Sequence, residues 1–237
     1  MPAPCRAMIS TVALAVLALT ATAADRRPAP GTAGEAPVVE FPASAGYRPL
    51  VLLLSAQGGW AAPERAMATL LASRQMPVVG LDWDAYPKRA MTTDAAAREL
   101  ADIVERYLGE WRRQQVVLVG YREGAGTLPF LANRLPHETR RKVRAVVLLA
   151  PPAVVAVEPS IQPSRDGTVL RFTQPVADEA GKLWGLRLVC LLGERDQATA
   201  PATWQHLDWA RVHALPCGAD LCDDWNAVAD TVVKSVL

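Results

Sequence analysis

The sequence has 237 residues, of which 51% are hydrophobic and 21% charged, so the chain can bury a large core and fits one globular domain. Its 25 basic and 24 acidic side chains nearly cancel, and a neutral chain creates no field that would attract nucleic acid. We therefore expect no nucleic-acid partner.

Residues 1–24 have the features of a secretory signal peptide. Arg6 lies in a short polar start, an apolar run extends from Met8 to Leu19, and small residues occupy positions 21–24. Cleavage is expected after Ala23 or Ala24, which predicts a periplasmic protein with no transmembrane anchor after cleavage. An uncleaved anchor is the alternative, although the apolar run is shorter than the roughly 20 residues that a membrane span needs.

Residues 25–46 are rich in Pro, Ala and Gly without an apolar period, so we expect an irregular lead-in or tether before a domain over residues 47–237. In that domain, apolar runs alternate with segments of helical period. Strands are predicted at 49–55, 77–81, 116–119, 143–149, 186–192 and 208–215, and helices at 63–74, 94–111, 124–135 and 224–236. This alternation predicts an α/β fold, with a mostly parallel sheet covered by helices on both faces.

The stretch from Val116 to Gly126 reads Val-Val-Leu-Val-Gly-Tyr-Arg-Glu-Gly-Ala-Gly and organises this domain. A buried strand followed by closely spaced glycines and a helix has the outline of a nucleophile elbow, whose G-x-S-x-G turn exposes a serine at the end of the sheet. Here the middle residue is Arg122, and a guanidinium that stays charged cannot act as a nucleophile.

Ligands of such sheets bind at the carboxyl ends of the strands. The residues predicted to line a pocket there are Gln57, Gly58, Trp60, Asp82, Tyr86, Tyr121, Arg122 and Glu123. Arg122 and its neighbour Glu123 are suited to holding an anion or a polar head group, and the alternative is that both point to solvent. We expect no cofactor.

Export would place three cysteines in an oxidising compartment. Cys190 lies in a predicted buried strand, where a free cysteine acts as a small hydrophobe. Cys217 and Cys222 are close enough for a disulfide before the last helix. A zinc site is the alternative, but there is no second ligand pair at metal spacing and His213 is alone nearby, so no metal is expected.

Several segments together resemble the bacterial virulence family of VirJ and AcvB type. They are Ser55–Trp60 with the helix after it, Pro77–Asp82, Val119–Tyr121 with Gly124 and Ala125, Leu128–Phe130, and Asn133–Pro136. The similarity spans residues 49–237 and is strongest up to Pro152. The resemblance implies a periplasmic α/β-hydrolase fold associated with virulence and type IV secretion. AcvB-type members are associated with hydrolysis of the aminoacyl ester of lysyl-phosphatidylglycerol.

The sequence departs from this family where chemistry would occur. The elbow serine is replaced by Arg122, and the Asp of the family's Gly-Asp-Gly-Gly-Trp loop is absent from Ala56–Trp60. The family's Gly-Gly-His-His-Phe run, which supplies the general base, corresponds to residues 217–221, with Ala219 and Asp220 at the histidine positions. The acid position survives as Asp196, but an acid that orients a histidine has no role without that histidine and a nucleophile.

Other groups are candidates for a rebuilt site: the hydroxyls of Ser55, Thr127 and Ser160, and the imidazoles of His137 and His213. Triads need mutual geometry that substitutions seldom recreate. The sequence therefore predicts a degenerate site in a non-catalytic protein that binds an envelope protein, an anionic small molecule or a lipid head group. The alternative is an esterase that acts on aminoacyl-phospholipid esters through a substitute nucleophile.

Overall fold

The computed structural model describes residues 38–83, 85, 92–156, 162–163, 169–170, 173–196 and 201–236. The main strands are β1 Val38–Phe41, β2 Leu50–Leu54, β3 Val78–Leu81, β4 Val116–Tyr121, β5 Val143–Leu149, β10 Leu188–Gly193 and β11 Arg211–Leu215. They form a seven-stranded sheet in the order β1-β3-β2-β4-β5-β10-β11. All neighbours pair in parallel except β1, which runs antiparallel to β3. The predicted mostly parallel α/β fold is confirmed.

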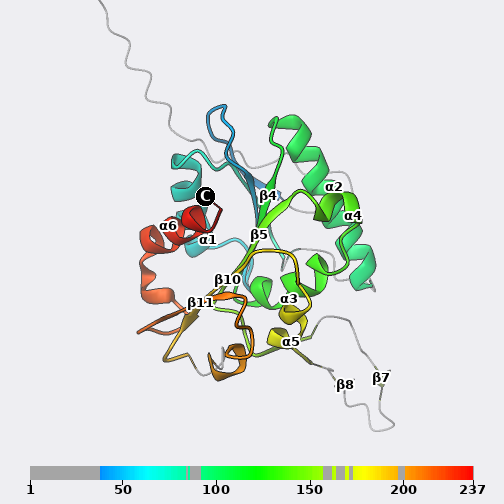
Figure 1. The fold of residues 1–237 in the computed structure, drawn as a ribbon, viewed down its shortest axis with the longest axis vertical. Helices are drawn as coiled ribbons and strands as arrows, with labels where there is room; N and C mark the ends of the chain where they lie inside the picture. Colours follow the sequence, from blue (N-terminus) through cyan, green and yellow to red (C-terminus); the bar gives the residue numbers. More distant parts are fainter. Residues whose placement is uncertain are drawn as a thin grey trace, which may run out of the picture.

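Helices cover both faces of this sheet. They are α1 Ala62–Ser73, α2 Thr93–Glu110, α3 Glu123–Ala132, α4 His137–Arg140, α5 Val176–Gly181 and α6 Trp225–Val236. Figure 1 shows α1 and α6 on one side and α2, α3 and α5 on the other. Successive residues of β2 point to opposite faces, so Leu52 joins the core under α2 and α3 while Leu53 joins the core under α1 and α6. Burial on both faces explains why this strand is apolar throughout.

The predicted irregular lead-in over residues 25–46 is wrong for the segment Val38–Phe41. These residues form β1, in which Val38 and Phe41 are buried and pair with the ends of β3. The Glu40 carboxylate also accepts a hydrogen bond of 2.6 Å from the Tyr107 hydroxyl on α2. The core therefore begins earlier than the composition suggests. The signal segment and residues 25–37 lie outside the described residues.

Smaller elements fill the connection between β5 and β10. Two short antiparallel pairs occur there, β6 Val154–Val155 with β9 Gln174–Pro175, and β7 Gln162–Pro163 with β8 Val169–Leu170. Single 3₁₀ turns follow at Pro201–Trp204 and Leu221–Asp223.

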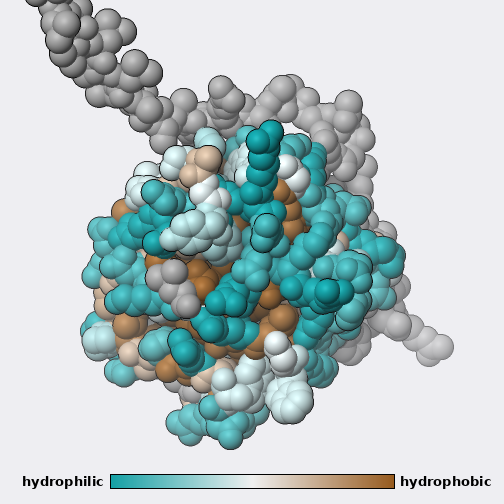
Figure 2. Space-filling view, turned by 45° about the horizontal axis from the view of Figure 1, so that its top comes forward, coloured by the Kyte–Doolittle hydropathy of each residue, from teal (hydrophilic) through white to brown (hydrophobic). Residues whose placement is uncertain are grey.

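The surface seen when the top of Figure 1 comes forward is mostly hydrophilic, with hydrophobic residues visible between the polar side chains (Figure 2). Within the described residues, no helix has both the length and the apolar character that crossing a membrane requires.

Candidate functional site

The turn between β4 and α3 has the predicted elbow shape. Arg122 stands between the two elements with φ 50° and ψ −114°, a conformation that L residues rarely adopt. Its backbone N–H donates to the Leu149 carbonyl on β5, and its own carbonyl accepts from Gly126 N–H in the first turn of α3. Strained conformations of this kind cost about 1–3 kcal/mol and cluster at functional sites. The chain keeps this backbone although an arginine occupies the apex.

Two glycines make the tight elbow possible. A Cβ added to Gly120 would lie 2.6 Å from the backbone of Ala125, and one added to Gly124 would lie 2.5 Å from the Ser55 carbonyl oxygen. Both distances are far below a normal contact. Glycine at these positions lets α3 approach the ends of β4 and β2 closely.

The Glu123 carboxylate accepts the backbone N–H of Gln57 at 3.0 Å, across a sequence separation of 66 residues. The same Oε2 atom lies 4.0 Å from Arg122 Nε, and the two side chains are 43% and 36% exposed. An ion pair this long and this exposed contributes little to stability. The Arg122 guanidinium therefore remains accessible to solvent. The Glu123 carboxylate accepts the hydrogen bond of a backbone N–H in the loop after β2, so that N–H is no longer free to bind a ligand.

Other carboxylates hold the rest of that loop. Glu64, which is 1% exposed, accepts the N–H groups of Ala56 and Ala61 at 3.1 Å each. Asp82, at the end of β3, accepts Trp60 N–H at 3.3 Å. Sequence reasoning missed Glu64, although an acidic residue at the third position of a helix is a known signal for capping the first turn. The backbone donors near the elbow are thus largely satisfied by the chain's own acidic groups.

The predicted pocket residues differ in exposure. Gln57 and Gly58 are exposed and Asp82 is half-buried, whereas Tyr121 is buried. The Trp60 ring packs against Phe41, with 6.0 Å between ring centroids, and lies over Gly80. Tyr86 lies outside the described residues.

The candidate hydroxyl groups take part in structural hydrogen bonds. Ser55 is fully buried, donates to the Ala56 carbonyl at 3.2 Å and accepts Trp83 N–H at 3.0 Å. Thr127 donates back along α3 to the Glu123 carbonyl at 3.1 Å. Ser160 lies outside the described residues. Neither described hydroxyl is hydrogen-bonded to an imidazole, as an activated nucleophile would be.

The candidate histidines lie away from the elbow. His213 on β11 is in register with Leu191, Leu149 and Tyr121 along one row of the sheet. Three strand spacings separate it from β4, a backbone distance of roughly 14 Å. His137 begins α4, and its side chain is 79% exposed.

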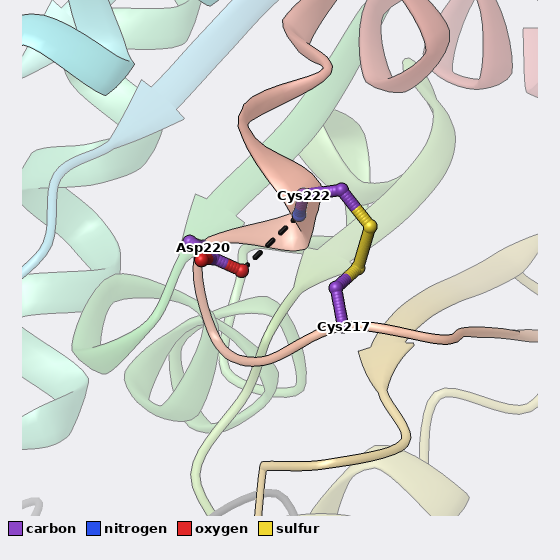
Figure 3. The surroundings of a disulfide bond; sticks show 3 residues. All are labelled: Cys217, Asp220 and Cys222. Carbon is purple, nitrogen blue, oxygen red and sulfur yellow. Dashed lines mark hydrogen bonds between the residues drawn. A yellow bond between two sulfur atoms is a disulfide. The ribbon is translucent and has the colours of Figure 1, made fainter.

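The loop after β11 carries the positions where the family has histidines. Cys217 and Cys222 form a disulfide in this loop, which is the first of the two alternatives left open by the sequence (Figure 3). Asp220 accepts Cys222 N–H at 3.1 Å. The Tyr121 hydroxyl donates to the Ala219 carbonyl at 3.3 Å, so this loop reaches the end of β4. Burial is the main cause that raises the pKa of Tyr121 to about 12.

The loop after β10 adjoins the disulfide loop. Arg195 N–H donates to the Cys217 carbonyl at 3.0 Å, and Asp196 N–H donates to Gly193 at 3.1 Å. Asp196 therefore lies in the loop next to the one that carries Ala219 and Asp220. Cys190 is free and buried, and burial raises the pKa of its thiol far above the usual value. In the described part of the chain, no three His, Cys, Asp or Glu side chains are grouped so that they could hold a metal ion.

A parallel sheet with a strained elbow after one of its central strands defines an α/β-hydrolase fold. Similar solved structures include an α/β hydrolase, GrgF, from Penicillium sp. sh18 (TM-score 0.61, 12% identity, 84% of this chain and 92% of that chain covered). Est1E from Butyrivibrio proteoclasticus matches with a TM-score of 0.59 and 12% identity over 85% of this chain and 95% of that one. A monoacylglycerol lipase from Paleococcus ferrophilus has a TM-score of 0.59 and 15% identity over 85% and 99% of the two chains.

The sequence identifies the family within this fold. The family model described as bacterial virulence protein (VirJ) matches residues 49–237, so the chain belongs to the VirJ family. This confirms the resemblance recognised in the sequence. No curated protein sequence matches the chain significantly.

Proposed function

We propose that this VirJ-family protein is exported to the periplasm and works there as a non-catalytic binding or accessory protein, with a role in virulence or type IV secretion. Export rests on the signal features of residues 1–24, and the role in virulence rests on the family. The absence of catalysis rests on the elbow, where one contact gives the main support.

That contact is the hydrogen bond from Gln57 N–H to the Glu123 carboxylate. In hydrolases of this fold, the oxyanion hole combines the N–H of the residue after the nucleophile with an N–H from the loop after an earlier strand. Gln57 belongs to that loop and Glu123 is the residue after the apex. A carboxylate bound to this donor repels a developing oxyanion and takes away part of the preorganised stabilisation on which acyl transfer depends.

The remaining machinery supports the same proposal. Arg122 offers no nucleophilic atom, and the sequence has no histidine after position 213. The Ser55 hydroxyl already donates one hydrogen bond, to the Ala56 carbonyl, and accepts another, from Trp83 N–H. His213 is three strands away from the elbow. The hydroxyls and imidazoles among the described residues therefore give no support to the alternative of an esterase with a substitute nucleophile.

The guanidinium of Arg122 indicates what the site binds. It is partly exposed and its contact with Glu123 is long, so it retains donors for an acidic group of a partner protein, a small anion or a lipid head group. Glu123 would compete with such a ligand for Arg122 and for Gln57 N–H.

The catalytic part of the proposal is tested by hydrolysis of short acyl esters and of lysyl-phosphatidylglycerol by the mature protein. An Arg122→Ser, Ala219→His, Asp220→His variant is assayed beside it. We expect the wild type to match the rate of a blank preparation. Turnover by the wild type that is lost in His213→Gln, a change at an exposed side chain, would establish the alternative esterase.

The binding part is tested by titrating the protein with sn-glycerol 3-phosphate as a probe for an anionic head group. Arg122→Ala should weaken binding because it removes the cation, and Glu123→Ala should strengthen it because it removes the competing carboxylate. Equal affinities in both variants would contradict an anion site at the elbow.

A further inference from the structure

A cluster of basic side chains lies where β5 and β10 begin, at the opposite end of the sheet from the elbow. Because β5 and β10 pair in parallel, the segments that precede them meet at one edge. The cluster comprises Arg140, Arg141, Lys142, Arg144, Lys182 and Arg187. We call it the basic cluster.

Half of the basic cluster has no carboxylate partner among the described residues. Arg140 donates to the carbonyls of Ala132 and Trp184, at 3.0 and 3.2 Å. Arg144 donates to the Val236 carbonyl at 3.2 Å, and Arg187 to the carbonyl of Ser235. These bonds orient the three guanidinium groups without neutralising their charge. The other three members pair with acids: Arg141 with Glu138, Lys142 with Glu105, and Lys182 with Glu179.

An exposed indole lies within the basic cluster. Trp184 stands in the turn between α5 and β10 and is 78% exposed. Its carbonyl is the acceptor of Arg140, so the tryptophan and the guanidinium group are held together. In contrast, Trp204 is 1% exposed, and Trp60, Trp83, Trp111, Trp209 and Trp225 pack against the two cores. Trp184 contributes little to the packing of this domain.

We propose that Trp184 and the basic cluster dock this protein on an anionic phospholipid surface. Tryptophan prefers the membrane–water interface, because its ring is apolar and its N–H remains hydrated. Arginine and lysine close to a bilayer are attracted to anionic head groups. A protein partner would instead require several adjacent apolar anchors. Among the described residues of the segments that carry the basic cluster, Trp184 is the only large hydrophobic side chain that is highly exposed.

This orientation turns the elbow away from the lipid, so an anion bound by Arg122 would be soluble or belong to a partner protein and not to the docked membrane. The loops at the carboxyl ends of β10 and β11 carry five acidic residues and one basic residue, Arg195, so this part of the far end of the sheet is acidic although the whole chain is nearly neutral. The five are Glu194, Asp196, Asp220, Asp223 and Asp224. A membrane would attract one end and repel the other. The inference concerns a different surface from the elbow, and it holds whether or not the elbow is catalytic.

The test is co-sedimentation of the mature protein with vesicles of phosphatidylcholine alone or of phosphatidylcholine mixed with phosphatidylglycerol. We expect binding only to the mixed vesicles, and weaker binding as salt is added. Arg144→Gln and Arg187→Gln should each weaken binding about fivefold, the effect of one basic residue near such a surface. Arg195→Gln, at the acidic end, is the matched control and should leave binding unchanged.

The indole is tested separately, because the substituted arginines also hold carbonyl groups. Trp184→Ala should weaken vesicle binding roughly tenfold, whereas Trp184→Phe should retain most of it. A phenyl ring can bury nearly as much apolar surface in the bilayer as an indole, and a methyl group buries much less. Melting curves of all variants report whether the fold is intact. Equal binding to neutral vesicles, unchanged binding by Trp184→Ala, or binding to an acidic polypeptide without binding to mixed vesicles would overturn the proposal.

Discussion

The backbone of Arg122 has the geometry that a nucleophile requires, while its side chain has none of the chemistry. Its φ of 50° places Cβ in an unfavourable position. The ion pair with Glu123, at 4.0 Å, contributes too little free energy to offset this strain. The neighbouring glycines and the packing of α3 enforce the turn. The strain is thus a property of the fold and does not depend on catalysis.

This account predicts that Arg122→Gly stabilises the protein by about 1 kcal/mol, because glycine adopts positive φ without strain. Urea unfolding measures the difference. Arg122→Ala is the control, since it removes the same side-chain contacts but keeps Cβ, and it should change the free energy of unfolding little. A destabilised Arg122→Gly would show that the elbow is not strained.

At the scale of elements, a buried carboxylate joins α3 to α5. The Glu179 side chain, 6% exposed, accepts hydrogen bonds from Asn133 at 3.0 Å and Arg134 at 3.2 Å, and from Lys182. Burial acts to raise the pKa of Glu179, but the bonds from Lys182 and Asn133 and the charges of Lys182 and Arg134 outweigh it, so the pKa lies below the usual value of 4.5.

A carboxyl group whose pKa is lowered by folding stabilises the protein above its unfolded pKa, and this contribution is lost as the pH falls through the folded value. We expect Glu179→Gln to cost about 1–3 kcal/mol at neutral pH, as loss of hydrogen bonds to a charged group does. The difference between wild type and variant should shrink as the pH falls below 4.5. Thermal melts from neutral to acid pH measure it, and a pH-independent difference would be the contrary result.

The disulfide loop is a second element whose contribution to the free energy of unfolding can be measured. Leu221, Cys222 and Asp223 all have positive φ, so the Cys217–Cys222 bond closes a segment of unfavourable backbone. Replacing both cysteines by serine should destabilise the protein by about 2 kcal/mol, the chain-entropy value for so short a loop. Melts with and without a reductant measure this in a Cys190→Ala background. Insensitivity to the reductant would contradict it.

Sequence patterns predict those elements whose burial is uniform. The runs that form β2 and β4 carry no charged residue, and β5 carries one, Arg144 near its start, because helices cover both of their faces. The elbow was also predictable, because Gly120 and Gly124 are required by close backbone contacts. The strand β1 was not, because it is short, follows a Pro- and Ala-rich segment and is stabilised by β3. The Gln57–Glu123 contact, between residues distant in sequence, has no local signal.

At the scale of the whole molecule, the domain is larger than its family match. Residues 49–237 match the family model, whereas β1 lies before that range and covers the edge of β3. Val38 and Phe41 are each 8% exposed, and an uncovered β3 would leave a sheet edge open to aggregation.

A protein that begins at residue 49 should therefore be less stable than one that begins at residue 38 by at least about 3 kcal/mol, the value of burying two such side chains. Denaturant unfolding of the two proteins measures the difference. Comparable stability would mean that β1 is dispensable and that the domain begins at the match.

We propose that the described residues of the elbow region include no activated nucleophile, and reaction of the mature protein with a fluorophosphonate probe is the experiment to make first. Such a probe modifies an activated serine whatever the natural substrate, and mass spectrometry identifies the modified residue. The account predicts no more adduct on the folded protein than on the unfolded chain, with an active serine esterase as the control for the probe. Selective modification of one serine in the folded protein, Ser55 above all, would contradict it.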